Sequence, residues 1–146
     1  MGKSENIKIF KGIKGIKEVY RDTLNTKSHL LSTLQPSKVE PKLYKWLTTD
    51  YVKERVKRKI FAFVFVSTKE KDKTLKDYIN KSDEELRKVI VVDPEGYPFE
   101  MEIIIYDNKV AFVQYNPKYE LGAILIESAP IANTMRSIFL HYLWKI

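Results

Sequence analysis

The chain has 146 residues, of which 44% are hydrophobic and 31% charged, and it contains no cysteine. This length fits one domain with a substantial core, and the lack of cysteine excludes a disulfide-stapled miniprotein, a cysteine-ligated metal module and a thiol enzyme. The net charge is +7, but residues 1–60 contain 15 basic and 6 acidic side chains, against 11 and 13 in residues 61–146. The basic excess is thus confined to the first part of the chain, and its lysine-rich composition is more typical of a solvated surface than of base recognition.

The apolar runs are too short to cross a membrane. Residues 60–66 and 101–105 are far below the ~18 consecutive apolar residues that a membrane span needs. The charged N-terminal residues lack the apolar segment of a signal peptide. We therefore expect one cytoplasmic domain over residues 1–146, with no membrane contact, no metal and no cofactor.

Hydrophobic periodicity predicts alternating strands and helices, followed by a run of strands. Strands are expected at residues 7–10, 29–34, 60–66, 87–92, 100–106, 110–115 and 122–127. Helices are expected at residues 12–24, from Pro41 into the basic tract 53–59, at 75–86, and from Ser128 to the C-terminus. The order β-α-β-α-β-α-β-β-β-β-α indicates an α/β domain in which helices flank a mixed sheet.

Local signals give detail to several of these elements. Residues 60–66 are apolar throughout, which predicts a central strand covered on both faces. Pro41 suits the first turn of a helix, which we expect residues 48–50 to interrupt before the basic tract 53–59 forms a solvated helix end. Residues 82–85 resemble a helix start. Ser128 and Pro130 predict the start of the last helix, whose apolar stripe consists of Ile131, Met135, Ile138, Phe139, Tyr142 and Leu143.

Motifs for nucleophilic or phosphate chemistry are weak. The two histidines, His29 and His141, lie in unremarkable positions, and no G-x-S-x-G elbow, P-loop or dinucleotide fingerprint is present. Residues 12–15 have the form of a phosphate-cradling GxxG loop, but a strand-to-helix turn that needs small residues explains them better. Glu100 and Glu102 lie two apart on a predicted strand, so both are expected on one face of the sheet, where paired acids serve acid–base chemistry or bind a cation or sugar hydroxyls.

The segment FKGIKGIKEVYRDTL, residues 10–24, resembles the opening of the phospholipase-D-like domain at the C-terminus of TrmB-type transcriptional regulators. Similar segments follow in the same order and spacing at residues 51–67, 86–92, 98–114, 122–128 and 131–144. The resemblance therefore spans nearly the whole chain, and it implies a phospholipase-D-like half-domain.

The same resemblance implies that the domain is inactive. Phospholipase-D enzymes use the motif H-x-K-x-x-x-x-D, in which the histidine attacks phosphorus and the lysine neutralises the phosphate. The segment PFEMEIIIYDNKV places Glu100 at the histidine position, Glu102 at the lysine position and Asp107 at the aspartate position. Two carboxylates would repel a phosphodiester. We therefore expect no catalytic residues, and a small effector such as a sugar near Glu100, Glu102, Tyr106 and Asp107.

The resemblance also implies partners. Phospholipase-D enzymes build one site from two half-domains, so a single half predicts a homodimer. In the regulators this domain follows a winged helix-turn-helix, which the few residues before the first expected strand cannot form. We therefore expect DNA contact only through a winged-helix domain, which is absent from this sequence. On this reading the chain is either an excised C-terminal domain or a stand-alone relative.

Two alternatives remain open from the sequence. A nucleic-acid-binding module would use the basic surface of residues 11–21 and 53–59, with Lys14, Lys17, Arg21, Arg55, Lys57 and Arg58. A residual metal-dependent hydrolase would centre on Glu100 and Glu102.

Overall fold

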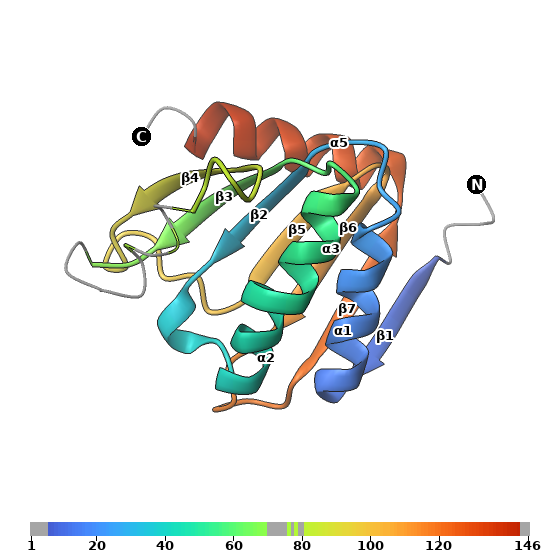
Figure 1. Cartoon of the computed structure of the whole chain (residues 1–146). Helices are drawn as coiled ribbons and strands as arrows, with labels where there is room; N and C mark the ends of the chain where they lie inside the picture. Colours follow the sequence, from blue (N-terminus) through green and yellow to red (C-terminus); the bar gives the residue numbers. More distant parts are fainter. Residues whose placement is uncertain (1–5, 70–75, 77, 79–80, 144–146) are drawn as a thin grey trace.

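The computed structural model describes residues 6–69, 76, 78 and 81–143, which form a seven-stranded mixed sheet between helices (Figure 1). The strands are β1 (Ile7–Lys11), β2 (Leu30–Leu34), β3 (Ala62–Ser67), β4 (Arg87–Val92), β5 (Glu102–Tyr106), β6 (Lys109–Gln114) and β7 (Gly122–Glu127). The helices are α1 (Gly12–Thr23), α2 (Pro41–Trp46), α3 (Val52–Lys57) and α5 (Ala129–Ile138). The expected α/β class is confirmed.

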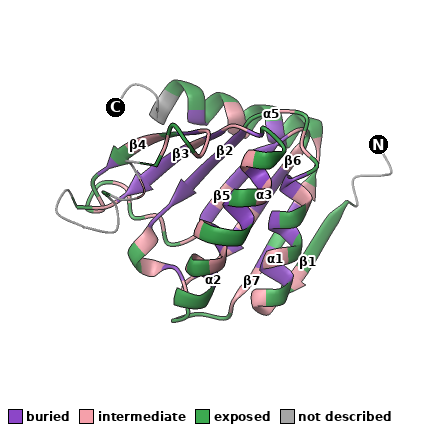
Figure 2. Cartoon of the chain, viewed as in Figure 1, coloured by how far each residue is buried: buried purple, intermediate pink, exposed green. Residues whose placement is uncertain are grey.

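The sheet has the order β1-β7-β6-β5-β2-β3-β4. Strands β2, β3 and β4 are parallel to one another, and β5, β6, β7 and β1 continue the sheet with antiparallel pairs. Helices α1, α2 and α3 cover one face, and α5 lies on the other (Figure 1). Figure 2 shows the buried residues concentrated in the strands beneath these helices.

Side chains of β3 contribute to two hydrophobic cores, one on each face of the sheet. Ala62, Val64 and Val66 belong to the core under α1–α3, whereas Phe65 belongs to the core under α5 and Phe63 packs against it. The neighbouring strands β2 and β4 pair with β3 along its whole length. A strand buried on both faces has no polar side, which explains the uninterrupted apolar run and confirms the predicted central strand.

The glycines of the GxxG segment serve the turn from β1 into α1. Gly12 has φ +69, a left-handed conformation that favours glycine, and its N–H donates to the Leu121 carbonyl at 2.8 Å. A Cβ at Gly15 would lie 2.8 Å from the Phe10 carbonyl carbon, so only glycine permits this close approach of helix and strand. The prediction of a strand-to-helix turn is confirmed.

Helices α2 and α3 form one continuous helix, so the interruption expected at residues 48–50 is wrong. A wider π-helical turn, Leu47–Tyr51, joins them instead. Thr48 Oγ1 donates to the Tyr44 carbonyl at 2.9 Å and Thr49 Oγ1 to the Lys45 carbonyl at 2.6 Å, so both hydroxyls bond back to the preceding turn rather than starting a new helix. At the N-terminus Pro41 occupies the first turn as predicted, with the Glu40 carboxylate accepting from Leu43 N at 2.8 Å.

The helix expected over residues 75–86 falls partly outside the described residues. Within them, residues 76 and 78 are helical, but residues 81–86 form turns, so the predicted helix start at 82–85 is wrong. The Arg87 N–H donates to the Ser82 carbonyl at 2.8 Å, and Leu86 has φ 51. These contacts bend the chain directly into β4.

Helix α5 begins as predicted, with Pro130 in its first turn and Ser128 Oγ accepting from Ile131 N at 3.3 Å. Its apolar stripe is only partly covered. Ala132 and Phe139 are buried against the sheet, whereas Ile131 and Ile138 are exposed. No helix among the described residues is long and apolar enough to span a membrane.

Candidate functional site

A cavity of about 70 Å³ lies between the sheet and the helix that α2 and α3 form. Leu30, Val64 and Ile104 form part of its floor on the sheet, and Leu47, Thr48 and Tyr51 line it from the π-helical turn. Such turns widen a helix and occur often at functional sites. The walls are mainly apolar, with a carboxyl group at one end and two guanidinium groups at the other.

Glu102 forms the carboxyl end. Its side chain faces α1, like Ile104 and Tyr106 at the alternate positions of β5, and it is 5% exposed. The Tyr20 hydroxyl donates a hydrogen bond to Glu102 Oε1. Burial raises the pKa of the Glu102 carboxyl well above its usual range, because the charged form is poorly solvated.

Arg55 belongs to the opposite end of the cavity, and it is buried. Its Nη1 donates to the carbonyls of Ile60 at 2.7 Å and Leu86 at 3.1 Å, and its Nη2 donates to the Glu85 carbonyl at 2.6 Å. Burial lowers the pKa of Arg55, an effect that the nearby Tyr51 opposes. The guanidinium therefore joins the end of α3 to the turn before β4, through carbonyl groups rather than through a carboxylate.

Arg87, at the start of β4, lies next to this end and is 4% exposed. Its guanidinium carbon lies 3.6 Å from the centre of the Tyr78 ring, and Nη2 donates to the Tyr78 carbonyl at 2.7 Å. The Glu85 carboxylate lies 3.5 Å from Nη2. Among the described residues, nothing accepts a hydrogen bond from the buried Nε of Arg87.

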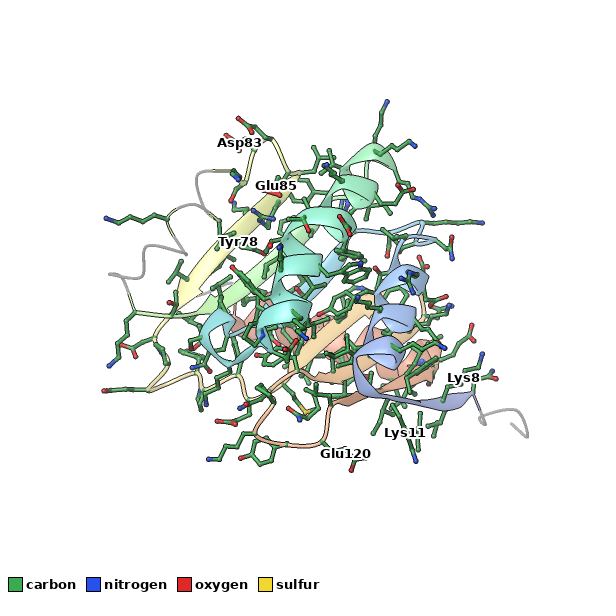
Figure 3. The ribbon with its side chains drawn as sticks, turned by 60° about the horizontal axis from the view of Figure 1, so that its bottom comes forward. Lys8, Lys11, Tyr78, Asp83, Glu85 and Glu120 are labelled. Atoms are coloured by element: carbon green, nitrogen blue, oxygen red, sulfur yellow. The ribbon has the colours of Figure 1, made fainter. Side chains whose placement is uncertain are left out.

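A wider hollow of about 210 Å³ adjoins the cavity at this end. The residues that line both are Tyr44, Thr48, Tyr78 and Arg87, and the hollow adds Thr49, Lys81 and Glu85. Figure 3 shows Tyr78 and Glu85 on the same side of the molecule, near β4. The hollow thus leads from the surface to the buried guanidiniums.

The residues predicted to bind a ligand do not form one site. β5 begins at Glu102, so Glu100 precedes the strand; its side chain is half exposed and forms an ion pair with Lys38. The expected pairing of Glu100 and Glu102 on one strand face is wrong, because the chain bends at residues 100 and 101 before the ladder starts. Of the four predicted ligand-binding residues, Glu102 lines the cavity.

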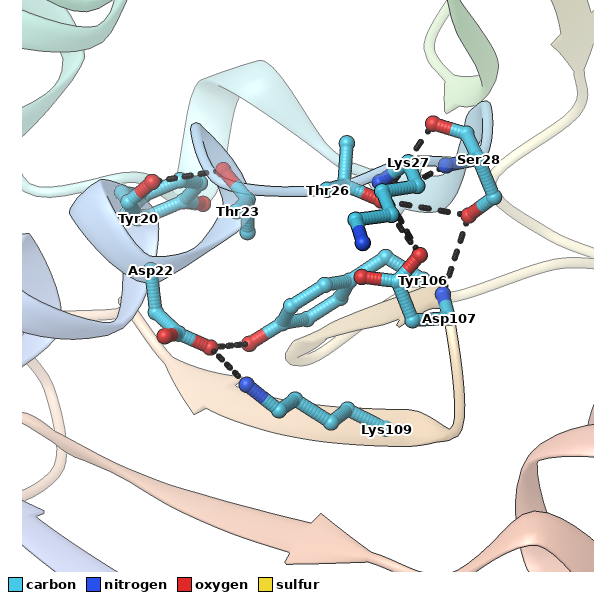
Figure 4. A network of polar contacts seen from close by, with 9 residues as sticks. All are labelled: Tyr20, Asp22, Thr23, Thr26, Lys27, Ser28, Tyr106, Asp107 and Lys109. Atoms are coloured by element: carbon cyan, nitrogen blue, oxygen red, sulfur yellow. Dashed lines mark hydrogen bonds and ion pairs between the residues drawn. The ribbon is translucent and has the colours of Figure 1, made fainter.

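Tyr106 and Asp107 lie at the other end of β5, in a polar network (Figure 4). The Tyr106 hydroxyl donates to Asp22 Oδ2 at 2.8 Å, and Lys109 Nζ lies 2.8 Å from the same oxygen. Asp107 has φ 49 in the hairpin turn, and its Oδ1 accepts from Thr26 Oγ1 at 3.1 Å. These contacts tie α1 to the β5–β6 hairpin, which gives Tyr106 and Asp107 structural partners.

The predicted nucleic-acid surface is not assembled as expected. Arg55 is buried, so the expectation of a fully solvated basic helix end is wrong there. Lys17 and Arg21 lie over the Trp46 ring at 5.2 and 5.6 Å from its centre. Arg58 donates to the Leu24 carbonyl at 2.9 Å. Lys14 and Lys57 are exposed on α1 and α3, respectively. Within the tract 53–59, Arg55 and Arg58 hold the helix to neighbouring segments.

Sequence reasoning missed Tyr20, Tyr51 and Arg87 as members of the site, and misplaced Arg55. A signal for Arg55 was present: it continues the four-residue spacing of the buried residues Leu43, Leu47 and Tyr51. No comparable local signal marks Tyr20, whose partner Glu102 is 82 positions away.

The described residues include no group of three histidine, aspartate or glutamate side chains placed to hold a metal ion. Neither histidine lines the cavity; His29 stacks edge-on with Phe61 and Phe63, and His141 is exposed beyond α5. The cavity can therefore bind through hydrogen bonds, charge and apolar contact.

No protein-family model matches the sequence, and no curated protein matches it significantly. Solved structures do match. The archaeal chromatin protein TrmBL2, described as showing a novel mode of DNA binding, is matched over 97% of this chain and 53% of its own, with 17% identity and a TM-score of 0.65. The chain therefore spans about half the length of TrmBL2.

Two enzymes show the same architecture. Polyphosphate kinase from Porphyromonas gingivalis is matched over 95% of this chain and 26% of its own, with 9% identity and a TM-score of 0.66. Phosphatidylserine synthase from Haemophilus influenzae Rd KW20 is matched over 96% of this chain and 37% of its own, with 11% identity and a TM-score of 0.67. At such identities the similarity establishes the fold: the chain has a phospholipase-D-like α/β fold.

Proposed function

We propose that the chain is a non-catalytic, cytoplasmic effector-sensing domain of a TrmB-like transcriptional regulator. The observation that carries this proposal is the cavity between the sheet and α2–α3, which has polar groups at both ends and no histidine or cysteine among its described lining residues. At the position where the resemblance puts the motif lysine, the chain has a buried carboxyl, Glu102. The structural similarity to TrmBL2 supports the regulatory assignment.

A ligand screen combined with a turnover assay tests this proposal. We expect at least one small metabolite to raise the thermal unfolding temperature, since a ligand that binds only the folded state stabilises it. We also expect no hydrolysis of bis-p-nitrophenyl phosphate, with or without divalent metal ions. Sugars belong in the screen, because the sugar effector implied by the resemblance stays a prediction. Metal-dependent hydrolysis that Glu102→Gln abolishes would refute the non-catalytic assignment.

The proposal includes a homodimer formed through the sheet face that α5 leaves open. On this face Ile7 and Ile9 of the edge strand β1 lie opposite Ile126 and Ile124 of β7. Ile9 is 71% exposed and Ile7 57%, and Ile124 of β7 is 42% exposed. Contiguous exposed apolar residues of this kind mark interaction surfaces, and a self-complementary patch satisfies two-fold symmetry.

We expect light scattering to give a dimeric mass for the wild type and a monomeric mass for the double variant Ile9→Lys/Ile124→Lys. Two buried lysines in one interface would cost far more than the apolar contact contributes. The control is Val91→Lys, which places a lysine at an exposed apolar position of β4. A monomeric wild type at high protein concentration would contradict the homodimer.

A further inference from the structure

The effector cavity carries an excess of positive charge, among the described residues, at the end that adjoins the hollow. Arg55 and Arg87 are both buried there, and Lys81 lines the adjoining hollow. Among the described residues, the carboxylate that approaches this group is Glu85, which lies 3.5 Å from Arg87. The acceptors of Arg55 among the described residues are carbonyl groups. Buried cations ordinarily have an anionic partner, and the described residues bring one carboxylate, that of Glu85, to two buried guanidiniums, so an anionic ligand would balance the second.

Arg87 is the group placed to meet that charge. It lies where the cavity and the hollow join, and no group in the described part of the chain accepts a hydrogen bond from its buried Nε. An unpartnered N–H of this kind is costly in a folded protein and is expected to find a partner. The planar guanidinium pairs well with a carboxylate, because its N–H groups match the two oxygens.

Between its two polar ends the cavity is mainly apolar. From the Arg87 end it runs along Ala62 and Val64 of β3, with Leu47 and Val52 from the helix, toward Ile104. By the strand register, Arg87 lies level with Ala62 and Leu30. Ile104 pairs with Ser32, two residues farther along β2, and Glu102 lies another two residues beyond Ile104 in the same direction, at the far end of the cavity. About four residues, or ~13 Å, separate the two ends along the strands. The charged head and the apolar tail of a ligand therefore have separate places.

Resting on the proposed function, we infer that the effector is a small organic monocarboxylate with a short unbranched apolar chain. Its carboxylate pairs with the Arg87 guanidinium at the junction of cavity and hollow, and its chain enters the cavity between β3 and α2–α3. The volume of about 70 Å³ is smaller than the 150 Å³ cavity that accommodates benzene in an engineered protein, which limits the enclosed part to a few carbon atoms.

Calorimetric titration with acetate, propionate, butyrate, hexanoate and octanoate tests this inference on the whole chain. We expect the affinity to rise about 4-fold per methylene group while the cavity fills, as burial of about 0.8 kcal/mol per methylene predicts, and then to stop rising. The uncharged amides of the same acids should bind at least 10-fold more weakly. Inorganic phosphate, which lacks the apolar chain, should bind no more tightly than acetate.

Two variants locate the site. Arg87→Lys keeps the charge but loses the planar pair of donors, and should weaken butyrate binding about 10-fold. Ala62→Leu fills the cavity from β3 and should abolish the gain per methylene; because Ala62 lies level with Arg87, it should weaken acetate binding as well. Arg136→Met, on α5 at the opposite face, is the matched control and should bind like the wild type. If Arg87→Lys does not fold, Ala62→Leu alone decides the location.

Equal affinity for acids and amides, or equal affinity across the chain lengths, would overturn the inference. If a sugar or another uncharged metabolite binds in the cavity and the carboxylates do not, the inference fails while the proposed sensing function stands. If no compound binds and the chain hydrolyses phosphodiesters, the proposed function itself fails.

Discussion

Replacing Arg55 by methionine is expected to lower the free energy of unfolding by about 3 kcal/mol. The guanidinium is 3% exposed and donates to the carbonyls of Ile60, Glu85 and Leu86. Without it these carbonyls lose their side-chain donor, and the turn in which Leu86 adopts φ 51 is held less firmly against α3. The Leu86 carbonyl keeps the Ala62 N–H as a donor, so the loss combines two acceptors deprived of this donor, the carbonyls of Ile60 and Glu85, with a backbone conformation that is unfavourable for leucine.

Urea denaturation of Arg55→Met and of its neighbour variant Lys57→Met measures this difference. Lys57 is exposed at the end of α3, so its replacement should change the free energy of unfolding by no more than ~0.5 kcal/mol. A solvated, nucleic-acid-binding role for the tract would predict the same small effect for both residues. Equal stabilities of the two variants would therefore contradict the buried position of Arg55.

Glu102 is expected to make the protein less stable as the pH rises above about 4.5. Burial raises the pKa of its carboxyl in the folded state, so between the ordinary value and the raised one the folded state binds more protons than the unfolded state. Stability then falls with increasing pH by up to ~1.4 kcal/mol per pH unit, until the folded carboxyl also ionises. This sign is opposite to that of a carboxylate held in an ion pair.

The variant Glu102→Gln removes this titration and keeps an acceptor for the Tyr20 hydroxyl. Chemical denaturation at pH 5 and pH 8 should therefore show the variant gaining stability relative to the wild type as the pH rises, by up to ~1.4 kcal/mol per pH unit. Glu100→Gln is the matched control, because Glu100 is half exposed and paired with Lys38 at the surface. A Glu102→Gln variant whose stability difference from the wild type is independent of pH would contradict the raised pKa.

Local sequence patterns were sufficient to predict much of the fold. Strands β4 and β7 have the predicted bounds, because each is a short apolar run bounded by turn residues. The turn at residues 12–15 was also predictable, since two closely spaced glycines after a strand are typical of a tight turn into a helix. The π-helical turn at Leu47–Tyr51 was not, because threonines that bond back to the helix look the same in sequence as threonines that end it.

The site depended on contacts that sequence spacing does not encode. Glu102 was identified, but its pairing with Glu100 failed because β5 starts two residues later than expected. Its partner Tyr20 comes from α1, and two of the three carbonyls that bind Arg55 come from the turn before β4. Each of these contacts joins segments at least 30 positions apart, so the sheet order decides them.

A nitrogen-15 amide-shift titration with butyrate tests for a small-molecule site between the sheet and α2–α3. We predict saturable shifts at Thr48, Tyr51, Val64 and Arg87, which line the cavity. The amides around Asp107, at the far end of β5, should stay unchanged. Saturable shifts confined to Asp107 and its neighbours, or no saturable shifts with any compound that stabilises the protein, would contradict the account.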